Sequence, residues 1–259
     1  MASDTIIGVP LDPHPHLRSL LQGEALPEDL QAGETSRRLF KIRSADSQGR
    51  RSSASILINR MYASRGYTSA GLPDEQLPAR ITLVASEHEI TIGTITIGFD
   101  SAAGLHVDDP FAQETHDLRA AGRRICEFTT LAMDSVVRSK RVLASLFHVA
   151  YIYAYRMMGF DTLLIEVNPR HRTYYERMLG FALLGAQRLN HRVNAPAVLM
   201  SLDFSHAHDQ IARCGGKPEA AAHDRSLYPF FFSVAEEASI VGRLRRTQPD
   251  AAYTHRAAA

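Results

Sequence analysis

Apolar and polar residues follow two different periods along this chain. Runs rich in β-branched residues, several of them alternating with glycine or polar residues, predict strands at 38–44, 79–85, 89–99, 124–133, 161–167, 182–189 and 197–204. Apolar residues at three- and four-residue spacing predict helices at 52–66, 141–159 and 169–179, with shorter helices at 112–120 and 233–246. Helices interspersed with strands predict an α/β fold with a mixed central sheet flanked by helices.

The longest predicted helix, 141–159, joins the predicted strands 124–133 and 161–167. A strand–helix–strand connection of this kind is right-handed, so these two strands should be parallel. Residues 38–204 contain no repeat and no linker, which predicts one domain. Residues 1–37 are proline-rich and lack periodicity, so we expect a mobile arm with one short helix around 16–22. Residues 205–259 should form an extension with one helix.

Composition narrows the class of protein. The 259 residues are 45% hydrophobic and 22% charged, with a net charge of +1, which argues against a nucleic-acid binder. The cations comprise 26 arginines and three lysines, a skew that fits either phosphate and carboxylate binding or codon bias. Two cysteines exclude a disulfide framework, and neither a CxxC or Cys/His zinc spacing nor an apolar run of ~20 residues occurs. We therefore expect a cytoplasmic protein with no metal and no membrane span.

A basic junction precedes the longest helix. Arg138, Lys140 and Arg141 stand where the helix should begin. The helix dipole disfavours cations at that end, whereas free backbone N–H groups there favour an anion. A solvated helix start is the simpler interpretation, but the three cations favour a phosphate site.

Two further positions are candidates for chemistry. Glu127 lies in an otherwise apolar strand, where a carboxylate is costly unless it is paired or wetted. It is either a general base or a structural partner of Arg123, Arg124 or Arg60. Tyr175, in a short helix after a buried strand, is either a proton donor to a leaving thiolate or a packing residue.

Residues 165–181 read IEVNPRHRTYYERMLGF, which resembles the acyl-carrier motif of the GNAT acyltransferase superfamily. The resemblance implies an acyl-CoA N-acyltransferase fold, with a pantetheine arm held between the strands 124–133 and 161–167. It assigns Asn168 to pantetheine binding and Tyr175 to protonation of the leaving thiolate. The glycine-rich pyrophosphate loop of that superfamily is replaced by VVRSKRVL, whose cations suit a single phosphate. The donor expected is therefore acyl carrier protein, less readily coenzyme A.

The same departure is typical of acyl-homoserine-lactone synthases, which residues 127–134 (EFTTLAMD) and 56–67 (ILINRMYASRGY) also resemble. Thr130 and Tyr67 stand where those enzymes have Arg and Trp, which disfavours lactone synthesis. Residues 118–134 and 150–171 are most similar to the long-chain N-acyl amino acid synthases of the FeeM type. That resemblance implies transfer of a fatty acyl group from acyl carrier protein to the α-amine of an amino acid, with no tightly bound cofactor.

The implied mechanism is direct attack of the amine on the thioester. Glu127 would take the amine proton, a backbone N–H near 131–133 would hold the oxyanion, and Tyr175 would protonate the thiol. Apolar residues of the strand and the long helix would line an acyl tunnel or simply pack the core: Phe128, Leu131, Met133, Leu146, Phe147 and Ala150. The cation for the acceptor carboxylate is Arg60, Arg65 or Arg124, which the sequence does not rank.

Charge is distributed unevenly around these elements. Residues 119–141 hold six basic residues and two acidic ones, which predicts one patch for an acidic carrier protein. Two other functions fit the same sequence: an acetyl-CoA-dependent N-acetyltransferase of small molecules, and a non-catalytic protein that binds acyl carriers.

Overall fold

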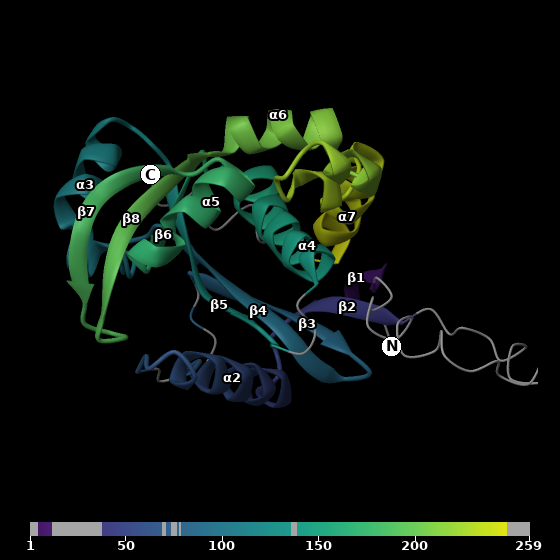
Figure 1. Cartoon of the computed structure of the whole chain (residues 1–259), viewed down its shortest axis with the longest axis horizontal. Helices are drawn as coiled ribbons and strands as arrows, with labels where there is room; N and C mark the ends of the chain where they lie inside the picture. The colour runs from purple at the N-terminus through teal and green to yellow at the C-terminus, as the bar shows by residue number, and fades with distance from the viewer. Residues whose placement is uncertain are drawn as a thin grey trace, which may run out of the picture.

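The computed structural model describes residues 5–11, 38–68, 71–73, 77, 79–135 and 139–247. At its centre is an eight-stranded sheet with the order β1-β2-β3-β4-β5-β6-β8-β7 (Figure 1). The strands are β1 (Thr5–Pro10), β2 (Leu39–Ser44), β3 (Arg80–Glu87), β4 (Ile90–Phe99), β5 (Ile125–Met133), β6 (Thr162–Val167), β7 (Ala182–Asn190) and β8 (Ala195–Asp203). β5 and β6 pair in parallel, as the crossover predicted, and the other neighbours are antiparallel.

Helices cover both faces of the sheet. They are α2 (Gln48–Ala63), α3 (Asp108–Ala120), α4 (Lys140–Tyr151), α5 (Arg172–Leu179), α6 (Phe204–Cys214) and α7 (Val234–Thr247), with short helices η2 (Ile152–Met157), η3 (Pro169–His171), η4 (Pro218–Ala222) and η5 (Tyr228–Phe230). α2 lies on one face against β4 and β5, and α4 lies on the opposite face with α6 and α7 (Figure 1). None of the helices in the described ranges is long and apolar enough to cross a bilayer.

The sequence explains where the helices around the crossover begin and end. Ser139 caps α4 by accepting a hydrogen bond from the backbone N–H of Val142. α4 is buried on nearly all sides, and it continues as the π-helical segment η2 to Gly159, which has a φ of 72°. α5 ends at Gly180, whose φ of 80° is a left-handed conformation that glycine adopts without strain. The single helix predicted over 141–159 is thus an α-helix followed by a π-helix.

The prediction of a mobile arm over 1–37 is wrong at its start. Thr5–Pro10 forms β1, which pairs with β2 at the edge of the sheet, and Ile6 and Val9 are buried in the main core. The short helix predicted around 16–22 lies outside the described residues. A strand of only six residues that ends in proline shows little alternation of apolar and polar residues, so its sequence alone does not predict it. It is a strand because it pairs with β2 at the edge of the sheet.

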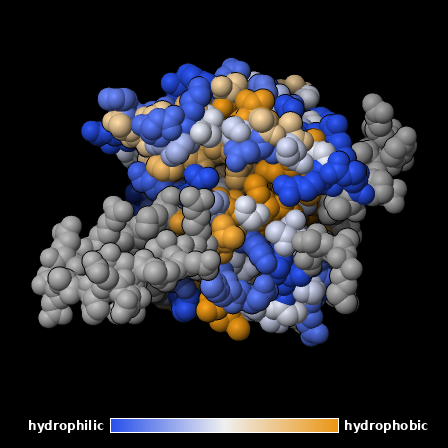
Figure 2. Space-filling model, turned by 90° about the vertical axis from the view of Figure 1, so that its right-hand side faces the viewer, coloured by the Kyte–Doolittle hydropathy of each residue, from blue (hydrophilic) through white to orange (hydrophobic). Residues whose placement is uncertain are grey.

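The boundary predicted at residue 204 is also wrong, because the C-terminal segment completes the main core. α6 begins directly after β8, with Asp203 as its cap, and the sequence analysis missed this helix. Phe232 and Ile240 are buried in the same cluster as β1 and α4. Figure 2 views the end of the molecule formed by β1, β2 and α7, where apolar side chains gather between charged ones.

Candidate active site

The sheet divides in the middle, where β5 and β6 part. They pair from Ile125 opposite Thr162 to Glu127 opposite Leu164. Beyond this point β5 remains paired with β4, and β6 remains paired with β8. A gap therefore opens between residues 128–133 and 165–167, at the place where the sequence analysis expected a pantetheine arm.

A β-bulge interrupts β5 just beyond the point where its pairing with β6 ends. Thr129 pairs with Thr96 and Ala132 with Thr94, so β5 has one extra residue. Thr130 has a φ of 46°, which a β-branched residue rarely adopts. Thr94 Oγ1 donates to the Thr130 carbonyl oxygen at 2.8 Å, and the Thr130 and Thr96 hydroxyls are 2.5 Å apart. Side chains of β4 thus hold a strained backbone at the gap, as is common in functional sites.

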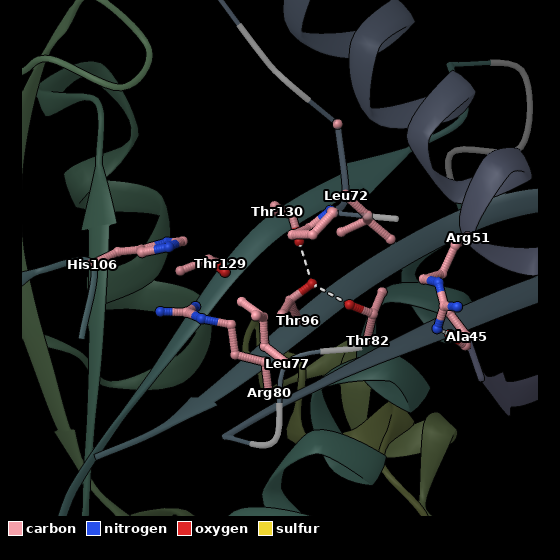
Figure 3. A pocket seen from close by; sticks show the side chains of 12 residues that line it. Ala45, Arg51, Leu72, Leu77, Arg80, Thr82, Thr96, His106, Thr129 and Thr130 are labelled. Carbon is pink, nitrogen blue, oxygen red and sulfur yellow. Dashed lines mark hydrogen bonds between the residues drawn. The ribbon is translucent and has the colours of Figure 1, made fainter. Parts of the chain in front are cut away.

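A cavity lies beside this bulge on the face that α2 covers. It encloses about 580 Å³, its open mouth included. Threonine side chains of three strands form its floor, and Figure 3 shows Thr82, Thr96 and Thr130 joined by hydrogen bonds. Its lining residues are Ala45, Arg51, Gly71, Leu72, Pro73, Leu77, Arg80, Thr82, Thr96, His106, Thr129 and Thr130.

Three polar atoms on the wall of this cavity are buried and have no hydrogen-bond partner among the residues that the structure describes. They are Arg51 Nε, Arg80 Nη1 and Thr129 Oγ1. Two of them belong to guanidinium groups, and the third is a hydroxyl that can donate. Buried donors without partners are rare in folded proteins and suit a ligand that carries acceptor oxygens.

Glu127 lies behind the cavity wall and is fully buried. Its Oε1 accepts from Arg80 Nη2 at 2.8 Å and from the backbone N–H of His106 at 2.9 Å, and its Oε2 accepts from the backbone N–H of Val107 at 3.0 Å. Of the partners considered from the sequence, Arg123, Arg124 and Arg60, none holds this carboxylate. Its partner is Arg80, which pairs with Glu127 over the open Cα of Gly98.

His106 is the imidazole that reaches the cavity, and sequence reasoning missed it. Its side chain is 43% exposed, and Nδ1 lies 3.9 Å from Glu127 Oε1. Burial lowers the pKa of His106; Glu127 opposes this shift, and the charges of Arg80 and Arg192 add to it. The imidazole is therefore neutral at neutral pH.

Arg119 fixes the loop that carries His106. Its guanidinium donates to both oxygens of Asp100, at 2.7 and 2.8 Å, and to both oxygens of Asp108, at 2.9 Å. Asp108 Oδ2 also accepts from the backbone N–H of Leu105 at 2.7 Å. Despite its burial, these donors lower the pKa of Asp108, so the carboxylate stays charged and the loop stays clamped.

Tyr175 lies on α5, which follows β6 directly. Its ring makes edge contacts with Tyr174 at 5.5 Å and with Phe181 at 5.9 Å between centroids. Burial raises the pKa of Tyr175 well above its ordinary value of 10. The phenol is therefore protonated at neutral pH, which is the state that a proton donor requires. The ring contacts fit a packing role equally well.

A second carboxylate that sequence reasoning missed lies on β6 at the gap. Glu166 Oε2 accepts from Asn190 Nδ2 at 2.7 Å and from Arg192, while Oε1 is buried and has no partner within the described ranges. Burial raises the pKa of Glu166 to about 7, and the charge of Arg192 opposes this shift. Arg192 also donates to the carbonyl oxygen of His106 at 2.6 Å, which links the two carboxylate clusters.

The residues expected to bind phosphate lie near the open end of the gap. Lys140 is exposed, with Nζ 5.9 Å from the Phe230 ring centroid, and Arg141 is half-buried with Nε unpartnered. Asn168 Oδ1 accepts from the backbone N–H of Arg170 at 3.2 Å and so caps η3. Arg138 lies outside the described residues.

The six residues expected to line an acyl tunnel gather on the α4 face of β5. Phe128 and Phe147 contact each other at 6.1 Å between ring centroids. Leu131 and Met133 are only partly buried, whereas the helix residues Leu146 and Ala150 are fully buried. These side chains form an apolar wall on the side of the gap opposite the cavity.

The structure does not bring the three arginines proposed for the acceptor carboxylate to the cavity. Arg60 Nη2 donates to Asp134 Oδ2 at 2.7 Å, and Arg65 Nη1 donates at 2.8 Å to the carbonyl one turn earlier in α2. Arg124 precedes β5, where it donates to the carbonyl oxygen of Met158 at 2.8 Å. The cations that do line the cavity are Arg51 and Arg80.

The prediction of one basic patch over 119–141 is wrong. Three of its residues precede β5 and three follow it, and a strand of nine residues spans about 30 Å. Arg119 and Arg123 are each held by two aspartates, so their charges are compensated. Within the described chain, only Lys140 and Arg141 of the six remain near the gap.

The family described as N-acyl amino acid synthase FeeM matches residues 53–203, which is more than half of the chain. The chain belongs to the FeeM family of N-acyl amino acid synthases. Within the FeeM family, the solved structure of FeeM from uncultured soil microbes is 30% identical, covering 64% of this chain and 90% of that one, with a TM-score of 0.58.

Other solved structures are more distant in sequence. The acyl-homoserine-lactone synthase LasI is 11% identical, covering 63% of this chain and 88% of that one, with a TM-score of 0.46. An acyl-CoA N-acyltransferase from Pseudomonas aeruginosa is 12% identical, covering 62% and 97%, with a TM-score of 0.44. No curated protein matches the chain at a significant level. Membership of the FeeM family identifies this chain as an acyltransferase, as its sequence predicted.

Proposed function

We propose that this acyltransferase moves a long-chain fatty acyl group from the phosphopantetheine thioester of acyl carrier protein to the α-amine of an amino acid. The observation that carries the proposal is the gap between β5 and β6. An apolar wall including Phe128 and Phe147 bounds one side, and a cavity lined by unpartnered donors bounds the other. A fatty thioester and a small polar acceptor would meet between them.

The donor assignment rests on the start of α4. Lys140 and Arg141 lie there in the first turn of the helix, at the positive end of its dipole. Two long cations and a helix N-terminus suit one phosphate, as in phosphopantetheine, rather than a pyrophosphate cradled by glycine backbone. Asn168, at the end of β6, lies beside the path that the arm would take into the gap.

The reaction joins the acceptor nitrogen to the acyl carbon and breaks the carbon–sulfur bond. The attacking amine needs to lose one proton before attack and a second as the amide forms. Backbone N–H groups of the unpaired part of β5, near 131–133, would stabilise the oxyanion. Tyr175 would donate its phenolic proton to the departing thiolate, and the proton released by nitrogen would restore the phenol.

The decisive experiment compares donors. Thiol release would be measured with fatty acyl groups of several lengths on acyl carrier protein and on coenzyme A, each with a mixture of amino acids. We expect the highest kcat/KM with long chains on carrier protein, and a loss of rate at high salt because the attraction of Lys140 and Arg141 for the phosphate is screened. Preference for acetyl-CoA would contradict the proposal, as would tight carrier binding without turnover. Mass spectrometry of lipids from an expressing host would then identify the amide.

Tyr175→Phe tests the proton donor, with Tyr174→Phe as its matched control on the same helix. We expect the Tyr175 variant to lose about 10²-fold in kcat, because an unprotonated thiolate is expelled more slowly. Tyr174 is more exposed and should tolerate the change. Equal rates for the two variants would show that Tyr175 only packs.

A further inference from the structure

The proposed reaction requires a base, and the contacts of Glu127 leave it poorly placed for that task. The carboxylate is fully buried, and three donors from Arg80, His106 and Val107 engage its two oxygens. An amine that approached it would have to displace one of these donors. Glu127 also does not belong to the described residues that line the cavity.

The imidazole of His106, in contrast to Glu127, lines the cavity. It lies at the same end of this cavity as Thr129 and Arg80, and Figure 3 shows these three side chains directed toward one another. Glu127 accepts the backbone N–H of His106 on one side, and Arg192 donates to the His106 carbonyl oxygen on the other. These two hydrogen bonds thus hold the backbone from which the imidazole extends toward the cavity.

Resting on the proposed function, we propose that the His106 imidazole accepts the proton of the acceptor ammonium, and that Glu127 is a positioning residue. His106 takes one proton from nitrogen and passes it to solvent through its exposed edge. The neutral amine then attacks the thioester carbon, and its second proton goes to the sulfur by way of Tyr175. Atoms and charges balance: acyl thioester and ammonium give amide, thiol and one released proton.

The neighbours of His106 also fit the other end of an amino acid. Beside it, Arg80 Nη1 and Thr129 Oγ1 are buried and find no partner in the described part of the chain. In an α-amino acid the carboxylate is attached to the same carbon as the amine. An amine in contact with His106 therefore carries its carboxylate toward these two donors, which would satisfy both.

The charged groups that face the imidazole determine its titration. Glu127 faces it from β5, Arg80 from β3, and Arg192 from the turn between β7 and β8. The two cations and burial outweigh the one carboxylate, so the pKa of His106 is lower than its ordinary 6.5. The base form therefore predominates at neutral pH, and kcat/KM should fall only in acid.

The test uses the full chain with His106→Gln, and with His116→Gln on the exposed side of α3 as the control. We expect the His106 variant to lose about 10²-fold or more in kcat/KM for amino acids, and to lose the acid limb of its pH profile. Hydroxylamine, which is unprotonated at neutral pH, should react with both variants at nearly the wild-type rate. A thermal melt close to that of wild type would show that the half-exposed site is still folded.

Glu127→Gln gives the second readout. Removing the carboxylate removes the charge that raises the pKa of His106, so the acid limb should move to lower pH while turnover persists. If Glu127 were the base, this variant would lose the limb and the His106 variant would keep it. An equal loss of amino-acid and hydroxylamine transfer in His106→Gln would overturn the inference. Wild-type protein that acylates no amino acid would overturn the proposed function itself.

Discussion

Gly98 offers a sharp test of how the buried ion pair is held. A Cβ added at this residue would lie 2.8 Å from Cγ and 2.9 Å from Oε1 of Glu127, and 3.0 Å from Arg80 Nη1. Real Cβ atoms essentially never approach other atoms this closely, so Gly98→Ala must displace the pair. The Glu127 side chain is fully buried and that of Arg80 is 15% exposed, which leaves little room for it to move.

The magnitude follows from these contacts. Overpacking of a core costs about 1–3 kcal/mol, and breaking a buried ion pair costs about 3–5 kcal/mol. Because the pair is displaced rather than removed, we expect Gly98→Ala to lower the free energy of unfolding by about 3 kcal/mol. For a chain of this size the loss corresponds to about 6–12 °C in Tm.

The assay is urea denaturation followed by far-ultraviolet circular dichroism, since the chain contains no tryptophan. Gly8→Ala is the matched control, because it also lies in a strand and a Cβ there would meet nothing within 4 Å. We expect this control to stay within about 0.5 kcal/mol of wild type. A Gly98 variant equally close to wild type would refute the reasoning that the ion pair is sterically fixed.

Three further changes probe the bulge and two buried titrating groups. Thr96→Val removes the hydroxyl bonded to Thr130, and we expect a loss of about 1–2 kcal/mol in urea denaturation together with a lower kcat, because the bulge relaxes. Burial lowers the pKa of His148, which is hydrogen-bonded to Glu237. Wild type should therefore lose free energy of unfolding relative to His148→Gln as pH falls below 6.5. If the free energies of unfolding of the two proteins changed in parallel with pH, the prediction would be contradicted. The pKa of Glu166 is raised from 4.5 to about 7, so wild type should lose up to about 3 kcal/mol relative to Glu166→Gln as pH rises through that range, measured by the same denaturation.

Local patterns predicted most of the fold. The strands flanking the long helix were found because their apolar runs are long, and their parallel pairing followed from the crossover. β1 was missed because Thr5–Pro10 is short and lies at the edge of the sheet. α6 was missed because it follows β8 with no intervening loop, and Asp203 serves both elements.

The candidate site was predicted only where one residue is unusual by itself. Glu127 stands out as a carboxylate in an apolar strand, but its partner Arg80 is 47 positions away, and only the sheet brings them together. His106 lies in an irregular acidic segment, and its position depends on the Arg119 clamp. The sequence shows only that a histidine lies in this segment, and nothing in it predicts that the folded loop brings this side chain to the cavity.

The contact between α7 and β1 has a consequence for the order in which the protein can be made. The two elements pack against each other and share one core with α4. During synthesis α4 emerges long before α7, so its apolar surface stays uncovered until almost all of the described chain has left the ribosome. The apolar core on that side of the sheet therefore closes late, and the nascent chain carries an aggregation-prone face while residues 152–247 are being synthesised.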